Sequence, residues 1–566
     1  MVGRFSLRIF SLMFSTDHSA QIIETPVLIV GAGPVGLALA GDLGWRGIPC
    51  TIIEQSDGSI YQPRQDLVGI RTMEFCRRWG IVGDVEASPY PRDYPQDNIY
   101  IAGDLVHGWE IGRYENPPMA GERPSPQSPQ HRERCPQNMF DPILKKFATS
   151  FDSVDLRYRH RFKSLVEEDA GVIADLEDLD RNTPVRIKAQ YVVGCDGAAS
   201  AVRDALGIAM EGNPALTYTT NVIFRYPEFE KLHDKRPGYR FIFLTATGTW
   251  ATIVAINGRD QWRMSIVRSS DHPRELSESE VRDAIGRAVG VDFDYKIVSI
   301  LPWTRRELVA KQFRKSRVFL AGDAAHCMSP TGGFGMNTGI GDIVDLSWKF
   351  AAIFDGWGGS GLLDAYEVER RPVAVRNVTE ASGNLARMMA PEDNEVFLED
   401  SEQGRKIRKE VGERFSERMK REWKSLGIHL GYTYEHSPII VRDGSAPSSD
   451  DPGFYIQSSC PGSRAPHVWR PDGSSTLDLY GWRFVLLRLG ADAPDTTPLA
   501  NAAQCCKMPL DVISIEEPDV IDAYERQLVL VRPDGHVAWR GDALPYDPEA
   551  LINVVRGAGK GEERTR

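Results

Sequence analysis

Long hydrophobic runs and C-x-x-C cysteine pairs are both missing from this sequence of 566 residues. No apolar stretch approaches the roughly 20 residues that a membrane-spanning helix needs, so we expect no membrane partner. The eight cysteines include no C-x-x-C pair and no matching histidine spacing. This pattern predicts neither a disulfide framework nor a metal site, and it favours a reducing, cytoplasmic location.

Excess positive charge is missing as well, because the formal net charge is -12 at pH 7. Nucleic acid and anionic membranes both repel such a chain, so neither is expected as a partner. Hydrophobic residues make up 42% of the sequence and charged residues 26%, which is ordinary for a globular protein of several domains. A small molecule is therefore the expected ligand class.

Residues 1–24 are predicted to form an N-terminal extension, with structure beginning at Pro26. The mostly apolar stretch from Ile9 to Phe14 is too short for a secretory signal and lacks a small-residue cleavage site. A weak transit peptide is the alternative, because no acidic residue precedes Asp17.

The first structured segment has the pattern of a βαβ unit. A wholly apolar run over 27–30 is followed at once by the Gly-Ala-Gly-Pro-Val-Gly stretch of 31–36. These features predict a buried parallel strand, a tight turn and a helix over 34–46, with a second strand over 50–54.

Within this unit, small residues occur where a nucleotide would need them. Gly31, Gly33 and Gly36 let the backbone approach a pyrophosphate at the N-terminus of the helix. Glu54 ends the second strand, where its carboxylate can accept hydrogen bonds from ribose hydroxyls. The unit predicts dinucleotide binding, but it does not separate NAD from FAD.

The rest of the chain alternates between kinds of structure. Residues 89–136 are rich in Pro, Arg and Gln, which predicts an irregular excursion. Short strand-like runs over 206–305 predict an antiparallel sheet that holds the substrate. Hydrophobic residues every four positions over 405–426 predict one packed helix, and 430–560 resembles a separate small α/β domain.

Two later motifs extend the first one. The stretch 193–203 contains Asp196-Gly197. The stretch 318–337 contains a second set of candidate residues, namely Gly322, Asp323, His326, Pro330, Gly333, Gly335, Met336 and Asn337. Together with 31–36, these motifs resemble in content and order those of the class A flavoprotein monooxygenases.

The resemblance implies a tightly but non-covalently bound FAD. Asp323 would bind the ribityl chain, and the backbone N–H groups around Gly322, Gly333, Gly335, Met336 and Asn337 would face the flavin ring, where dipoles stabilise developing negative charge. The Asp196-Gly197 motif is associated with both FAD and the pyridine nucleotide. Arg64 and Gln137 occupy positions at which related enzymes place cofactor-contacting residues.

The segment from Asp66 to Glu74 most resembles that of phenol hydroxylases. In them the aspartate faces the substrate hydroxyl, so Asp66 would draw off the phenolic proton and activate the ring. This sequence departs from the family in having Leu67 instead of glycine and Ser329-Pro330 instead of a proline pair. Pro330 and His326 complete the candidate catalytic set, although His326 is expected to pack beside the flavin motif more than to act as a base.

Other polar groups on the predicted sheet, Tyr218, Arg225 and Arg263, are possible pocket residues that the sequence does not single out. The last region resembles the thioredoxin-like tail domain of these hydroxylases. It has no C-x-x-C motif, and its adjacent Cys505 and Cys506 are not expected to reproduce thioredoxin chemistry. We expect this domain to serve packing or homodimer formation.

The predicted fold class is mixed α/β and α+β, with four parts after the N-terminal extension. They are a discontinuous Rossmann-like FAD-binding domain (25–105, 130–205 and 306–390), an inserted antiparallel-sheet substrate domain (106–129 and 206–305), a connecting helix (391–430) and a thioredoxin-like domain (431–560).

The resemblance implies a monooxygenase that hydroxylates a phenolic ring with O2 and NADH or NADPH through a C4a-hydroperoxyflavin. One alternative is a Baeyer–Villiger or polyketide-tailoring oxygenation by the same flavin, which would not need Asp66. Another is a flavin-binding or ligand-binding protein without turnover, against which the intact Glu54, Asp196 and Asp323 weigh. A flavin halogenase is disfavoured, because no W-x-W-x-I-P segment is present.

Overall fold

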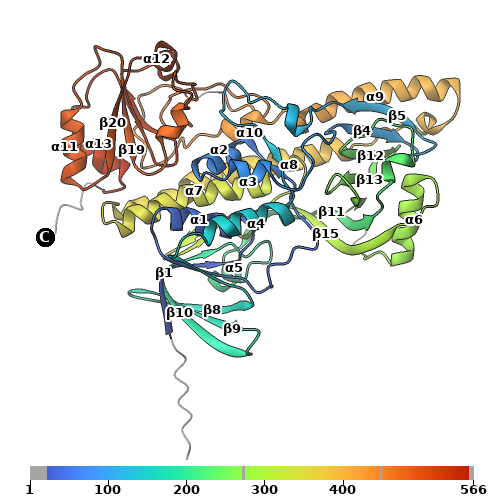
Figure 1. Cartoon of the computed structure of the whole chain (residues 1–566), viewed down its shortest axis with the longest axis horizontal. Coiled ribbons are helices and arrows are strands. Elements are labelled where there is room, and N and C mark those ends of the chain that lie inside the picture. Colours follow the sequence, from blue (N-terminus) through green and yellow to red (C-terminus); the bar gives the residue numbers. More distant parts are fainter. Residues whose placement is uncertain (1–21, 270–273, 447–448, 560–566) are drawn as a thin grey trace, which may run out of the picture.

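The computed structural model describes residues 22–269, 274–446 and 449–559. Within these ranges three large sheets, each with its own helices, form three regions (Figure 1). No helix in the described ranges is long and apolar enough to cross a membrane. Most of the predicted N-terminal extension lies outside the described residues, and the first strand begins at Ile22, earlier than expected.

The first sheet has the strand order β16-β17-β10-β1-β2-β7, with β8 and β9 extending from β10. Its parallel strands are β1 (Ile22–Val30), β2 (Cys50–Ile53), β7 (Val154–Arg157), β10 (Thr183–Gly194) and β17 (Val318–Leu320). Antiparallel additions are β8 (His160–Glu168), β9 (Gly171–Asp178) and β16 (Arg314–Lys315). Strands far apart in the sequence therefore share one sheet, which confirms the predicted discontinuous Rossmann-like fold.

Helices α1 (Pro34–Trp45), α4 (Gln137–Ala148) and α7 (Gly335–Phe354) pack together beside this sheet (Figure 1). Their apolar residues join those of the strands in the largest hydrophobic core, in which Val27, Leu28 and Ile29 are fully buried. The carboxyl ends of β1, β10 and β17 consequently meet the N-termini of helices at one edge of the sheet.

The second sheet has the order β18-β15-β11-β14-β13-β12-β4-β5 and is antiparallel except for the parallel β4–β12 pair. Its strands are β4 (Asn98–Ala102), β5 (Trp109–Tyr114), β11 (Met210–Arg225), β12 (Arg240–Thr245), β13 (Gly248–Ala255), β14 (Gln261–Ser269), β15 (Lys296–Ala310) and β18 (His326–Cys327). Helix α6 (Glu278–Val289) packs on one face, and α8 (Ala365–Met389) and α9 (Glu402–Trp423) pack on the other.

The prediction of irregular structure over 89–136 is wrong for β4 and β5. Residues 98–102 are apolar or aromatic apart from Asn98, and all are buried between other strands. Prolines flank these strands without interrupting them, so the composition of the whole stretch concealed two short β segments. Although β4 falls in the range predicted for the FAD-binding domain, its partners belong to the second sheet.

The third sheet has the order β20-β19-β21-β22. Its chain order is β19 (Phe484–Leu489), α11 (Thr497–Cys505), β20 (Leu510–Ile515), α12 (Pro518–Tyr524), β21 (Leu528–Val531), β22 (Val537–Gly541) and α13 (Pro548–Val555). Strands β19 and β20 are parallel and the other pairs antiparallel, which is the predicted thioredoxin-like arrangement.

Shorter elements connect these regions. They are α2 (Ile70–Arg78), α3 (Val82–Glu86), α5 (Ala201–Leu206), α10 (Leu426–Leu430), the paired β3 (Leu67–Val68) and β6 (Glu133–Arg134), and the 3-10 turns Met119–Gly121, Phe229–Lys231, Gly322–Ala324, Ser360–Leu362, Glu395–Leu398 and Thr476–Leu479. The helix predicted over 405–426 is α9, and it ends at Trp423.

A fully buried ion cluster fastens the third region to α7 and α8. Lys349 Nζ lies 2.6 Å from Asp345 Oδ2 and 2.5 Å from Glu369 Oε2, and Arg532 from the β21–β22 turn contacts both acids and Asp534. Burial raises the pKa of Asp345 well above its ordinary value. With Asp345 protonated, two cations balance two carboxylates, so no net charge is left in the interior.

Removing Arg532 should therefore leave buried carboxylates uncompensated. We expect Arg532→Met to lower the free energy of unfolding in urea by about 3–5 kcal/mol. The control is Arg483→Met, because Arg483 pairs with Asp511 at the surface and should contribute less than about 1 kcal/mol. Equal losses in the two variants would contradict a stabilising role of the cluster.

Candidate active site

The glycines that follow β1 differ in what surrounds them. A Cβ on Gly36 would lie 1.9 Å from the carbonyl oxygen of Gly31, and one on Gly31 (φ 104°) would lie 2.4 Å from that of Cys195. These two positions need glycine for close backbone packing. Gly33, in contrast, has no atom within 4 Å of its Cβ position, so open space lies beside the N-terminus of α1.

Glu54 lies directly across this turn. Its Oε2 accepts a hydrogen bond from the Ala32 amide at 3.0 Å, and its Oε1 accepts one from the Ser56 amide at 2.8 Å. Each carboxylate oxygen retains a second lone pair for a ribose hydroxyl. The carboxylate is thereby fixed at the end of β2, where the sequence predicted it.

Gln137 and Arg64 are neighbours, as the predicted shared role requires. Gln137 Oε1 accepts a hydrogen bond from the Arg64 amide at 3.0 Å, and its Nε2 donates one to Asp141 Oδ2 at 3.1 Å. Burial raises the pKa of Asp141 to about 8. The Arg64 side chain is exposed, with its guanidinium 5.6 Å from the centre of the Trp303 ring.

The carboxylate of Asp196 makes its hydrogen bonds within its own turn. Its carboxylate accepts hydrogen bonds from Ser200 Oγ at 2.5 Å and from the Val202 amide at 3.1 Å, which stabilises the start of α5. Burial raises the pKa of Asp196 above its ordinary value. Gly197 has φ 82°, a conformation that favours glycine.

Asp323 has an unused carboxylate. Burial raises the pKa of Asp323, and no donor of the described residues makes a hydrogen bond to its side chain. Nearby, the first intrahelical bond of α7 runs from the Thr338 amide to Phe334, so the amides of Gly335, Met336 and Asn337 have no helical partner. A half-buried acceptor beside free amides and the open space at Gly33 fits a flavin dinucleotide.

The Asn337 side chain is fully engaged within the protein. Its Oδ1 accepts hydrogen bonds from the Gly69 amide at 2.8 Å and from Thr72 Oγ1 at 2.7 Å. Its Nδ2 donates to the carbonyl oxygens of Gly333 at 2.7 Å and Leu67 at 3.2 Å. Asn337 therefore holds the glycine-rich loop against the segment that carries Asp66, and only its backbone amide is left for a cofactor.

His326 is fully buried, and its Nε2 lies 2.7 Å from Asp342 Oδ2. Asp342 also accepts hydrogen bonds from the Gly322 amide at 3.1 Å and from Arg370 Nε at 2.9 Å. These contacts give His326 a packing role beneath the loop, so its inclusion among the catalytic candidates has no support. Pro330 lies exposed in the loop between Ser329 and Gly333.

Asp66 is held by three side chains. Arg134 Nη1 donates to its Oδ1 at 2.9 Å, Tyr239 donates its hydroxyl to Oδ2, and Arg263 Nη2 lies 3.7 Å from Oδ2. Burial acts to raise the pKa of Asp66, but the arginines Arg134 and Arg263 outweigh it and lower the net value. Asp66 is therefore a carboxylate that stays ionised.

Of the possible pocket residues, only Arg263 reaches Asp66. Arg225 is half-exposed beside Asp260, and Tyr218 alternates to the opposite side of β11 from Thr217 and Thr219. The sequence analysis did not identify Arg134 and Tyr239. Neither residue belongs to a recognisable motif, because one is a single arginine before a cysteine and the other a tyrosine before β12.

Arg305 is the other residue that the sequence did not indicate. Strand register places Arg305 opposite Thr217, on the side of the sheet from which Arg263 projects. Arg305 is 5% exposed, its Nε and Nη1 have no hydrogen-bond partner, and the hydroxyls of Thr217 and Thr219 have none either. Burial lowers the pKa of Arg305 to about 10, with further lowering by Arg240.

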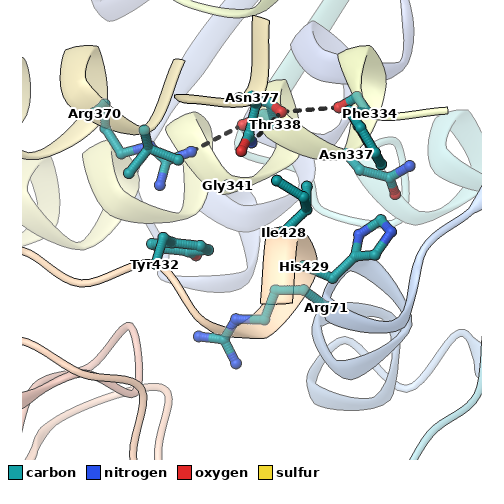
Figure 2. Close-up of a pocket in the computed structure, with 11 residues that line it drawn as sticks. Arg71, Phe334, Asn337, Thr338, Gly341, Arg370, Asn377, Ile428, His429 and Tyr432 are labelled. Atoms are coloured by element: carbon teal, nitrogen blue, oxygen red, sulfur yellow. Dashed lines mark hydrogen bonds between the residues drawn. The ribbon is translucent and has the colours of Figure 1, made fainter. Parts of the chain in front are cut away.

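A small pocket of about 20 Å³ lies behind α7 (Figure 2). Hydrogen bonds from Arg370 and Asn377 to Thr338 close one side of it, and His429 and Arg71 face the other. Its volume holds about one water molecule, so it is too small for a substrate.

One group of possible metal ligands, Glu86, His131 and Glu133, occurs among the residues that the structure describes. Arg92 lies 2.9 Å from Glu133 and 3.6 Å from Glu86. The acids therefore already have a cationic partner, and nothing else at this place indicates a metal.

Comparison with known proteins agrees with this geometry. A family model described as an FAD binding domain matches residues 24–381, and an aromatic-ring hydroxylase C-terminal model matches 458–557. The FAD-dependent monooxygenase apdD of Emericella nidulans is 32% identical over 94% of this chain and 90% of its own length. The 4-methyl-5-nitrocatechol 5-monooxygenase of a Burkholderia species is 32% identical over 94% and 96%.

A solved structure of RebC with bound 7-carboxy-K252c has a TM-score of 0.87 at 38% identity, covering 95% of this chain and 100% of that one. The chain belongs to the FAD-binding family of class A flavoprotein aromatic monooxygenases. It is an FAD-dependent oxidoreductase of the aromatic hydroxylase type.

The open space at Gly33 yields a direct test of the dinucleotide site. Gly33→Ala adds a methyl group that meets no protein atom, so the fold should be unchanged while the affinity for FAD falls at least tenfold. FAD affinity is measured by flavin fluorescence quenching on the apoprotein. Gly83→Ala on α3, which also has open space around its Cβ position, is the matched control. Equal affinities in both variants would argue against a pyrophosphate at Gly33.

Proposed function

We propose that this enzyme inserts one oxygen atom of O2 into a phenolic ring, with NADH or NADPH as the reductant. The observation that carries the proposal is the ionised Asp66, held where the second sheet meets the glycine-rich loop. A Cβ on Gly333 would lie 3.3 Å from the Leu67 side chain, so Asp66 is one residue from direct contact with that loop.

In this proposal Asp66 accepts a hydrogen bond from the phenolic hydroxyl. Its oxygens are already used by Arg134, Tyr239 and Arg263, but a carboxylate has about four acceptor positions in all. Because its pKa is lowered, Asp66 is a weak base that orients the hydroxyl and stabilises positive charge on the departing proton. The ring thereby gains electron density toward the oxygen that it receives.

FAD, when bound, supplies the reduction of O2 and the transfer of one oxygen atom. The other steps depend on residues of the protein. The α7 amides and Asp323 hold the cofactor, and the second sheet covers the substrate. Helices α8 and α9 close that face, with Arg240 Nη1 bonded to Glu422 Oε1 at 2.9 Å. A closed face excludes water from the reacting oxygen.

The buried, unpartnered Arg305 favours a substrate that also carries an acidic group. The charge of Glu422 only partly offsets the cost of burying this guanidinium, and a carboxylate would satisfy its free N–H groups. The presence of 7-carboxy-K252c in RebC agrees with a carboxylated polycyclic ligand for this type of site. A simple phenol would leave Arg305 without a partner.

The finer expectations rest on the family resemblance. We expect a homodimer and a cytoplasmic location, the latter supported by eight cysteines that are all free. The same flavin could serve a Baeyer–Villiger oxygenation, and loss of turnover would leave a binding protein.

The test is an aerobic assay of the yellow, FAD-loaded protein. Pyridine-nucleotide oxidation is followed with simple phenols, hydroxybenzoates, nitrocatechols and carboxylated polycyclic phenols, and product mass is measured. We expect one phenol to accelerate oxidation and to yield a product heavier by one oxygen. A colourless protein that does not take up FAD would refute the proposal. If no compound of the panel accelerates pyridine-nucleotide oxidation, the alternative of a binding protein without turnover is favoured.

Asp66→Asn separates hydroxylation from the Baeyer–Villiger alternative in the same assay. We expect hydroxylation to fall by a factor of about 10²–10⁴, the usual contribution of a positioned acid–base group. Asp155→Asn, at a surface pair with Arg157, is the control. Full activity of Asp66→Asn would favour ketone oxygenation instead.

Arg305→Met tests the acidic group. With a carboxylated phenol, KM should rise at least tenfold while kcat changes less, and the matching carboxamide should show little difference between wild type and variant. Arg225→Met, on a half-exposed arginine of β11, should behave like the wild type. Equal KM values for the acid in wild type and Arg305→Met would remove the argument for an acidic substrate.

A further inference from the structure

A second cavity, of about 240 Å³, lies between α2 and the thioredoxin-like region, and Asp66 is not among its lining residues. Trp45, Phe75 and Trp482 supply aromatic walls, and the rings of Trp45 and Trp482 are 4.6 Å apart. The cavity is slightly smaller than the usual range of about 300–1,000 Å³ for ligand pockets, which limits an occupant to one or two rings.

The charges in its wall do not balance. Arg77 forms two hydrogen bonds with Asp478, at 2.7 and 2.8 Å, and Glu74 is shared by Arg71 and Arg464. Both acids are thus satisfied, whereas Arg78 has no hydrogen bond or ion pair with any described residue. Its Nη1 is a buried donor without a partner.

The surroundings make this free cation costly. Burial lowers the pKa of Arg78 to about 10, the like charges of Arg71 and Arg46 add to the effect, and the charges of Asp42 and Asp534 oppose it in part. Arg71 Nε and Arg46 Nη2 are also buried donors without partners. Arg71 and Arg78, which both line the cavity, therefore each have an unused N–H group that an anion would satisfy, whereas Arg46 does not line it.

Two glycines of the third region pack closely against these arginines. Gly535 has φ 89°, and a Cβ there would lie 3.6 Å from the Nη2 atoms of both Arg71 and Arg78. Gly481 has φ 149°, and a Cβ there would lie 3.3 Å from Arg78 Nε. A side chain at either position would touch the arginines of α2, so the room for an anion is the volume of the cavity itself.

We propose that this cavity binds a small aromatic carboxylate, distinct from the substrate, with its ring against Trp45 and Trp482 and its carboxylate on Arg78. A carboxylate matches a guanidinium in geometry. A single negative charge is favoured over a phosphate dianion because Glu74 and Asp478 also line the cavity. Aromatic walls exclude a simple inorganic anion as the preferred ligand.

The cavity is connected to the flavin loop through α2. Arg78 is six residues from Thr72, which corresponds to about 9 Å along a helix. Thr72 Oγ1 donates to Asn337 Oδ1 at 2.7 Å, and Asn337 holds the glycine-rich loop. A ligand on Arg78 would therefore contact the same helix whose first turn is hydrogen-bonded to Asn337.

Calorimetric titration of the FAD-loaded full chain with 2-naphthoate tests the proposal. We expect a naphthoate site whose affinity falls at least tenfold in Arg78→Met and is retained in Arg305→Met, whereas any naphthoate bound in the substrate site weakens in Arg305→Met. Neutral 2-naphthamide should bind at least tenfold more weakly than naphthoate. Loss of binding in Arg305→Met but not in Arg78→Met would move the probe to the substrate site and overturn the proposal, as would absence of binding or equal affinity for the amide.

Tryptophan fluorescence gives a second readout should Arg78→Met fail to fold. Naphthoate should quench the wild-type emission, and Trp482→Phe should remove a large part of that change. Trp482 is 54% exposed, so its replacement is tolerable, and the 50% exposed Trp469, which does not line the cavity, supplies the control Trp469→Phe. Equal quenching in the two variants would contradict binding in this cavity. Neither readout requires turnover, so failure here is distinct from failure of the proposed hydroxylation.

Discussion

The arrangement of the site depends on the hydrogen bonds of the side-chain amide of Asn337. Its four hydrogen bonds join the glycine-rich loop at Gly333 to Leu67, Gly69 and Thr72, on the segment that starts with Asp66. A side chain that uses all its donors and acceptors has one preferred orientation. The N-terminus of α7, the carboxylate of Asp66 and the start of α2 consequently share one fixed frame, although they come from opposite ends of the first region.

The thioredoxin-like region is bonded directly to the helices of this site. Besides the cluster around Arg532, Arg71 Nη2 donates to the carbonyl oxygen of Asp534 at 3.0 Å, and Arg464 binds Glu74. The region has no cysteine pair in a redox motif, and its contacts are with the helices that carry the flavin loop. Its structural contribution is to restrain α2, α7 and α8 from the side opposite the second sheet.

The local sequence pattern predicted the fold well at positions where the backbone geometry allows only one type of residue. Gly31, Gly36 and Glu54 could be identified because tight packing and a strand end require them, and apolar runs predicted β1 and β2 of the first sheet. The pattern failed for β4, whose strand character comes from burial between distant strands. It also could not find Arg134, Tyr239 and Arg305, since the fold must bring distant segments together before the first two reach Asp66 and the third lies near Arg263. Nor could it distinguish His326, a buried partner of Asp342, from a base, because both roles suit a histidine near a glycine-rich loop.

In the role proposed for Asp323, cofactor uptake would be coupled to protons. Burial raises the pKa of this carboxyl in the cofactor-free protein. Cofactor hydroxyl groups that donate to the carboxylate would favour its ionised form, so their binding would release a proton wherever the acid is protonated. If Asp323 holds the cofactor, the affinity for the cofactor would increase as the pH rises through the pKa of Asp323 in the cofactor-free protein.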